Sequence, residues 1–129
     1  MSWLFRNLTS MSDTNPKVDE FFERYAAALL GRDAKAVAEM YAVPSLIVFP
    51  GNVIPVGDAK QTEEFFASSW GQYEGVRTVD RQTTVMAEAP GTVWVDVTWS
   101  YSGQPQERFC YQLVEGAHGY QIVVLTPLE

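Results

Sequence analysis

The period of the hydrophobic pattern changes once along this sequence, close to Val76. In the helical segments before that point apolar residues recur every three or four positions, as they do in amphipathic helices. Beyond it they alternate with polar residues at every second position, as they do in half-buried strands. Helices followed by a run of long strands favour an α+β fold, in which the helices cover one face of a curved antiparallel sheet.

The helical half carries clear start and stop signals. Asn15-Pro16 is typical of a helix start, and Gly31 is typical of the residue just after a helix. Asp33 is expected to cap a second, shorter helix, which the pair Val43-Pro44 ends. Tyr41 is expected on the apolar face of this second helix.

Two short strands, 45–49 and 53–56, are expected next. Asp58 with Gln61 then resembles a capping pair, which opens a third helix. The second half of the chain predicts four long strands separated by turns rich in Gly and Pro, at about 76–88, 92–101, 106–115 and 120–126.

Length and composition indicate one folded domain. The chain has 129 residues, of which 47% are hydrophobic and 19% charged, so it can bury a core. We expect a leader over residues 1–15 and a single domain over residues 16–129. The net charge is −7 and no stretch is rich in Lys or Arg, so no nucleic-acid partner is expected. No membrane span or secretory signal is recognised, so we expect a cytoplasmic protein.

Reactive residues are few. Cys110 is the single cysteine and His118 the single histidine, so neither an internal disulfide nor a metal site of cysteines and histidines is expected. No motif for a cofactor is present either, and we expect none. Asp80 is the one strand carboxylate whose facing the pattern leaves open.

The hairpin formed by 92–101 and 106–115 is the most informative segment. If its turn holds an even number of residues, as in the commonest hairpins, Trp99 lies opposite Arg108 and Val95 lies opposite Gln112. A turn with an odd number of residues would reverse this facing. The apolar face of the first strand must meet the helices; it consists of Val93, Val95, Val97, Trp99 and Tyr101.

The even register has two consequences. Arg108 and Gln112 point inward, and a buried amide such as Gln112 needs a protein partner, a water or a ligand. The outer face then carries an apolar patch, which marks an interface. We therefore expect a homodimer packed sheet to sheet through Trp94, Phe109, Tyr111 and Leu113.

A resemblance to a known family runs from Glu23 to Phe66. This segment reads ERYAAALLGRDAKAVAEMYAVPSLIVFPGNVIPVGDAKQTEEFF. It resembles the opening half of the nuclear-transport-factor-two-like superfamily, which includes ketosteroid isomerases, SnoaL-like polyketide cyclases and scytalone dehydratase. The later strand-turn WSYSGQP is similar to that of ketosteroid isomerases. The resemblance implies a cystatin-like or SnoaL-like cone, in which a strongly curved sheet wraps around a long N-terminal helix and a pocket opens at the wide end.

The resemblance also implies roles for single residues. Tyr25 matches the oxyanion-binding tyrosine of the isomerases, and Tyr41 matches the tyrosine that supports it. Gln112 falls where those enzymes place a protonated Asp, and an amide can still donate a hydrogen bond. Phe49 stands at the position of their general-base Asp and cannot accept a proton.

Two functions remain open at this point. In the first, the cone binds a small, mostly apolar organic molecule with a carbonyl or hydroxyl group, and isomerase, dehydratase or cyclase chemistry would rest on Tyr25 and Gln112. In the second, the chain is a non-catalytic dimerisation or protein-interaction module with a filled cone. A cavity of roughly 300 Å³ or more favours the first. The residues expected to bind the ligand are Tyr41, Phe49, Phe66, Val95, Val97, Trp99 and Arg108.

Overall fold

The structure, a computed structural model, describes residues 15–102 and 105–129. Three α-helices and a short 3-10 helix come from the first part of the chain: α1 (Pro16–Leu30), α2 (Ala34–Glu39), α3 (Ala59–Ala67) and the 3-10 turn Trp70–Tyr73. Six strands make the sheet: β1 (Tyr41–Phe49), β2 (Asn52–Val56), β3 (Val79–Ala89), β4 (Thr92–Tyr101), β5 (Glu107–Gly116) and β6 (Gly119–Pro127).

The predicted helix starts are confirmed by their capping bonds. The Asn15 side chain accepts from the backbone N–H of Val18 at 3.1 Å, and the Asp33 side chain caps α2 in the same way. Asp58 accepts from the N–H of Gln61 at 2.8 Å. Each bond satisfies a backbone donor that the first turn of a helix leaves without a partner.

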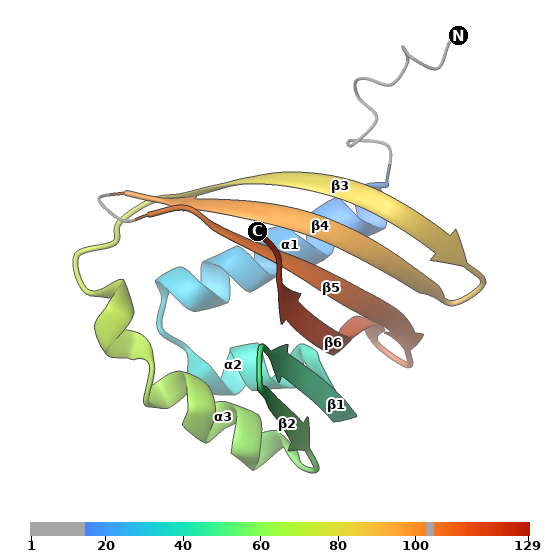
Figure 1. The fold of residues 1–129 in the computed structure, drawn as a ribbon, viewed down its shortest axis with the longest axis horizontal. Helices are drawn as coiled ribbons and strands as arrows, with labels where there is room; N and C mark the ends of the chain where they lie inside the picture. Colours follow the sequence, from blue (N-terminus) through green and yellow to red (C-terminus); the bar gives the residue numbers. More distant parts are fainter. Residues whose placement is uncertain (1–14, 103–104) are drawn as a thin grey trace, which may run out of the picture.

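The strands form one curved sheet with the order β2-β1-β6-β5-β4-β3. Neighbouring strands are antiparallel, except that β1 and β6 run parallel. The sheet bends over α1, while α2 and α3 lie beyond the helix on the side of β1 and β2 (Figure 1). The predicted α+β fold is therefore confirmed, as a curved sheet that does not close on itself.

The core lies between α1 and the inner face of the sheet. Along β4 every second side chain is buried, as the alternating pattern predicts. The face of α1 that meets these side chains carries Val18, Phe21, Phe22 and Tyr25, all of which are at most 3% exposed. Burial of each large apolar side chain contributes roughly 1.5–3 kcal/mol, so this contact is the main support of the fold.

Tyr41 lies on a strand and not on the second helix, so that prediction was wrong. α2 ends at Glu39, and the backbone N–H of Ile122 in β6 donates to the carbonyl of Met40 at 2.8 Å. Pairing with β6 therefore draws the following residues into β1. Tyr41 remains buried, at 2% exposure.

The register of the β4–β5 hairpin is also opposite to the predicted one. Trp99 pairs with Glu107 and Val95 pairs with Tyr111. Five residues, 102–106, separate the two strands, where the prediction assumed an even turn. The odd number shifts every pair by one residue and turns each side chain of β5 to the other face.

Two predictions fail with this register. Arg108 and Gln112 lie on the outer face and not in the interior. Tyr111 and Leu113 are buried in the core at 2% and 0% exposure, and Phe109 is partly buried against it. The four residues of the predicted dimer patch therefore do not share a surface, and of them only Trp94 faces outward.

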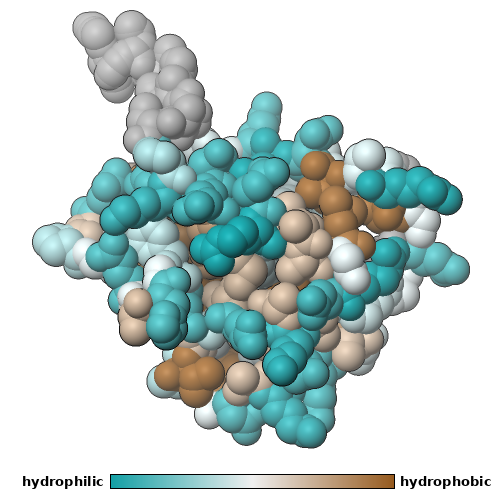
Figure 2. All heavy atoms as spheres, turned by 180° about the vertical axis from the view of Figure 1, so that it is seen from behind, coloured by the Kyte–Doolittle hydropathy of each residue, from teal (hydrophilic) through white to brown (hydrophobic). Residues whose placement is uncertain are grey.

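Hydrophobic side chains do not dominate the face shown in Figure 2. Most of its surface is hydrophilic, and strongly hydrophobic atoms gather in two separate places, near the upper right and the lower left. Among the described residues, the large hydrophobic side chains that are exposed belong to β1, β2 and β3: Val43, Leu46, Val53 and Met86. Within the described ranges, no helix has both the length and the hydrophobicity that crossing a bilayer requires.

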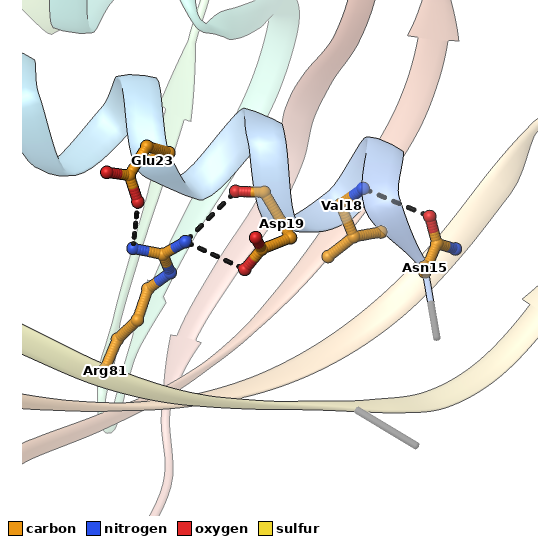
Figure 3. A network of polar contacts seen from close by, with 5 residues as sticks. All are labelled: Asn15, Val18, Asp19, Glu23 and Arg81. Carbon is orange, nitrogen blue, oxygen red and sulfur yellow. Dashed lines mark hydrogen bonds and ion pairs between the residues drawn. The ribbon is translucent and has the colours of Figure 1, made fainter. Parts of the chain in front are cut away.

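Arg81 ties the edge strand β3 to α1. Its guanidinium donates to the Asp19 carboxylate at 2.9 Å and to the Asp19 carbonyl at 3.1 Å, and it reaches Glu23 at 3.0 Å (Figure 3). The Arg81 side chain is 14% exposed, whereas those of its two acidic partners are 68% and 75% exposed. The neighbouring Asp80 points to the solvent.

Arg81→Met should lower the free energy of unfolding by about 1 kcal/mol, because it removes two ion pairs whose acidic partners are largely hydrated. Urea denaturation would measure this, and the difference from the wild type should shrink in 1 M NaCl. The matched control is Lys60→Met, which removes an exposed contact with Glu64 of 4.0 Å and should change little. An equal loss in both variants would contradict a special role of Arg81.

Candidate functional site

A cavity of about 140 Å³ lies between the C-terminal half of α1, helix α3 and the inner face of the sheet. Aromatic side chains form most of its wall. The described residues that line it are Tyr25, Leu29, Phe49, Phe65, Phe66, Ser69, Tyr101, Glu107, Phe109, Tyr111 and Leu125.

Two of the aromatic side chains that line the cavity are hydrogen bonded to buried aromatic side chains behind them. The hydroxyls of Tyr25 and Tyr41 lie 2.8 Å apart and are hydrogen bonded. The indole Nε1–H of Trp99 donates to the Tyr111 hydroxyl at 2.8 Å. The rings of Tyr25 and Tyr111 meet edge to face, with centroids 6.0 Å apart. Tyr25 and Tyr111 both line the cavity, and the hydroxyl of each is positioned by a buried neighbour.

Glu107 adds a carboxylate to this aromatic cavity. It begins β5 opposite Trp99 and shares the inner face with Phe109 and Tyr111. Glu107 is the only charged residue among the described residues that line the cavity. Within the part of the chain that the structure describes, its carboxylate makes neither an ion pair nor a hydrogen bond.

The predicted site residues fall into three groups. Tyr25, Phe49 and Phe66 line the cavity, and Tyr41 lies behind Tyr25 at one hydrogen bond's distance. The others are not part of the described lining. The side chains that pack in the core below it are Val95, Val97 and Trp99, and those on the other face of the sheet are Arg108 and Gln112.

Polar contacts hold Arg108 and Gln112 on the outer face of the sheet. Gln112 donates to the Thr92 hydroxyl at 3.2 Å. Arg108 donates two hydrogen bonds to the Asp96 carboxylate, from Nε to Oδ1 at 3.0 Å and from Nη2 to Oδ2 at 2.6 Å. Hydrogen bonding to Asp96 and its negative charge raise the pKa of Arg108. Burial, and then the charge of Asp96, raise the pKa of the Cys110 thiol between these residues.

The register error explains why the sequence analysis missed the lining residues on β5. Phe109 and Tyr111 were expected on the outer face but line the cavity, and Glu107, to which the sequence analysis gave no role, lines it too. The alternation of Phe109, Tyr111 and Leu113 was a usable signal, because an apolar face of a strand normally meets the core. Burying that face would have required a turn with an odd number of residues.

Two larger hollows lie on the surface. A groove of about 770 Å³ between the start of α1 and β3 has a polar wall that contains the Arg81 ion pairs. A second groove of about 730 Å³ lies beside α2 and the β5–β6 turn and includes His118. The smaller aromatic cavity is the candidate site, because three of the predicted site residues, Tyr25, Phe49 and Phe66, line it.

Comparison with known families identifies the fold family. The model of the family described as NTF2-like protein (DUF6841) matches residues 13–129. The chain belongs to this NTF2-like family. The resemblance inferred from residues 23–66 is thereby confirmed at the level of the NTF2-like fold. A comparison with curated proteins gives no match.

Solved structures with the same fold include three from different bacteria. An NTF2-like protein of unknown function from Shewanella oneidensis has a TM-score of 0.73 at 10% identity, covering 88% of this chain and 98% of its own. A provisionally named aromatic ring hydroxylase from Novosphingobium aromaticivorans has a TM-score of 0.61 at 14% identity. The match covers 86% of this chain and 85% of the hydroxylase chain. A provisionally named calcium/calmodulin-dependent protein kinase II association domain from Xanthomonas campestris has a TM-score of 0.63 at 16% identity. The match covers 87% of this chain and 86% of the association-domain chain. At these identities the likeness establishes the fold alone.

Tyr111→Phe should destabilise the protein by about 1–3 kcal/mol, because the buried indole N–H of Trp99 loses the Tyr111 oxygen as its acceptor. Urea denaturation followed by tryptophan fluorescence would measure the change. Tyr120→Phe is the control, since the half-buried Tyr120 hydroxyl has no hydrogen bond within the described part of the chain. A loss below about 0.5 kcal/mol in Tyr111→Phe would argue against this hydrogen bond as a determinant of the site.

Proposed function

We propose that the cavity binds a small, mostly apolar organic molecule that carries a carbonyl or hydroxyl group. The observation that supports this proposal is the aromatic hollow at the end of α1, which has phenolic hydroxyls in an otherwise largely apolar wall. Ligand sites of this kind combine an apolar wall with a few positioned polar groups. The NTF2-like fold, which often binds small molecules, is consistent with the proposal.

The volume limits the ligand to about one ring. A cavity of about 150 Å³ can hold benzene, and this cavity measures about 140 Å³. A steroid or polyketide would require the wall to move. Ring-sized alcohols and ketones are therefore the first ligands to consider.

Tyr25 is the group proposed to hold the ligand's oxygen. A hydrogen bond received from the Tyr41 hydroxyl would polarise Tyr25 and strengthen it as a donor to a carbonyl or hydroxyl. This arrangement supports the roles that the resemblance to ketosteroid isomerases implied for these two tyrosines. Gln112 has no part in the proposal, since it lies on the outer face.

The proposal is confined to binding. Turnover of the isomerase, dehydratase or cyclase type, as in the SnoaL-like and ketosteroid isomerase branch, needs a proton acceptor beside the substrate. Phe49 lines the cavity but cannot accept a proton. Among the described lining residues, Glu107 carries the only carboxylate.

Cyclohexanol, cyclohexanone and benzyl alcohol should bind to the wild-type protein, and their binding can be followed by chemical-shift titration. Tyr25→Phe should weaken binding about tenfold, because the ligand's oxygen loses one buried hydrogen bond. Ser69→Phe should abolish it, because Ser69 lines the cavity just after α3 and the new ring would fill the space.

Gln112→Leu is the control for this experiment, since its side chain lies on the other face of the sheet. It should bind all three probes as the wild type does. Thermal melts would establish that each variant is folded. Absence of binding to the wild type, or equal binding in Ser69→Phe, would contradict the proposal.

A second function has one observation in its favour. The cavity is smaller than the roughly 300–1,000 Å³ of typical ligand sites, as expected for a module whose cone is largely filled by its own side chains. The likeness to a provisionally named association domain is compatible with this alternative. In this case the chain should form dimers at tens of micromolar in sedimentation equilibrium and bind none of the probes. A monomer that binds the probes would exclude it.

A further inference from the structure

We propose that the preferred ligand of the cavity is an organic cation, a ring-sized ammonium ion whose charge lies beside Glu107 and whose hydrocarbon part packs against the aromatic wall. This inference rests on the proposed function, because it concerns the same cavity. It adds the charge of the ligand, which the tyrosine hydroxyls alone do not determine.

The charge balance of the cavity is the first argument. Glu107 is the one charged side chain among its described lining residues. The adjacent Arg108 points to the opposite face of the sheet, where Asp96 already holds its guanidinium. A ligand that covers the Glu107 carboxylate would remove water from it, and without a positive partner this desolvation is costly.

The composition of the wall is the second argument. Seven of the eleven described lining residues are phenylalanine or tyrosine. The face of an aromatic ring is negative and attracts cations, and aromatic cages recognise alkylammonium groups in this way. The aromatic rings of the wall and the Glu107 carboxylate therefore both favour a positively charged ligand.

The same features disfavour acidic ligands. A carboxylate or phosphate in this cavity would lie close to Glu107, and repulsion between like charges is stronger beside a largely apolar wall than in the solvent. The net charge of −7 also raises the local concentration of cations around the protein. The cavity should therefore rank ligands of one shape as cation, then neutral molecule, then anion.

Benzylammonium, benzyl alcohol and benzoate test this ranking, because the three have similar size and differ in charge. Calorimetric or chemical-shift titration of the full chain at pH 7 should show benzylammonium binding about tenfold more tightly than benzyl alcohol, and benzoate most weakly. Glu107→Gln keeps the shape of the side chain and should bring the affinities for benzylammonium and benzyl alcohol within about twofold of each other.

Glu115→Gln is the matched control, since it makes the same substitution in the same strand at an exposed glutamate outside the cavity. It should keep the preference for the cation. Binding of benzyl alcohol without a preference for benzylammonium would overturn the cation proposal and leave the proposed function intact. A preference that survives in Glu107→Gln would overturn it too, whereas absence of binding by all three probes would remove both proposals.

Discussion

The β4–β5 hairpin determines what the cavity contains, because side chains alternate between the two faces of a strand. Its register places Phe109, Tyr111 and Leu113 on the inner face, and it places Arg108 and Gln112 on the outer face. Outside, Arg108 can meet Asp96 from the neighbouring strand. Inside, Tyr111 can meet Trp99. One pairing thus produces a polar outer surface and an aromatic inner one, and a shift by one residue would lose both.

The position of the cavity follows from how α1 meets the sheet. At the N-terminal half of the helix, Phe21 and Phe22 fill the space beneath the strands and are almost completely buried. Arg81 holds the edge strand β3 against this half of the helix. Toward the C-terminal half, the wall is shared between the sheet, α1 and α3. The hollow therefore forms where α3 completes the enclosure, and side chains of α3 can control its volume.

Much of the fold could be predicted from local signals, whereas the pairing of distant strands could not. The caps at Asn15, Asp33 and Asp58 are local, because each side chain bonds to a backbone three residues away, and each prediction was correct. Tyr41 was misplaced because its strand forms by pairing with β6, about 80 residues later in the chain. Tyr25, Phe49 and Phe66 were found because helix periodicity and family resemblance do not depend on the hairpin. Glu107 and Tyr111 were missed because their facing depends on the number of residues in one turn.

Glu107 is the position at which a half-buried charged side chain meets the aromatic wall of the cavity. Its partner across the hairpin is Trp99, and the next residues of β5 on its face are aromatic. A carboxylate in such surroundings avoids a large desolvation penalty only if it keeps contact with water or gains a positive partner. Occupancy of the cavity and the charge of its occupant are therefore coupled. The more completely a ligand excludes water from Glu107, the more the ligand must itself supply the compensating charge.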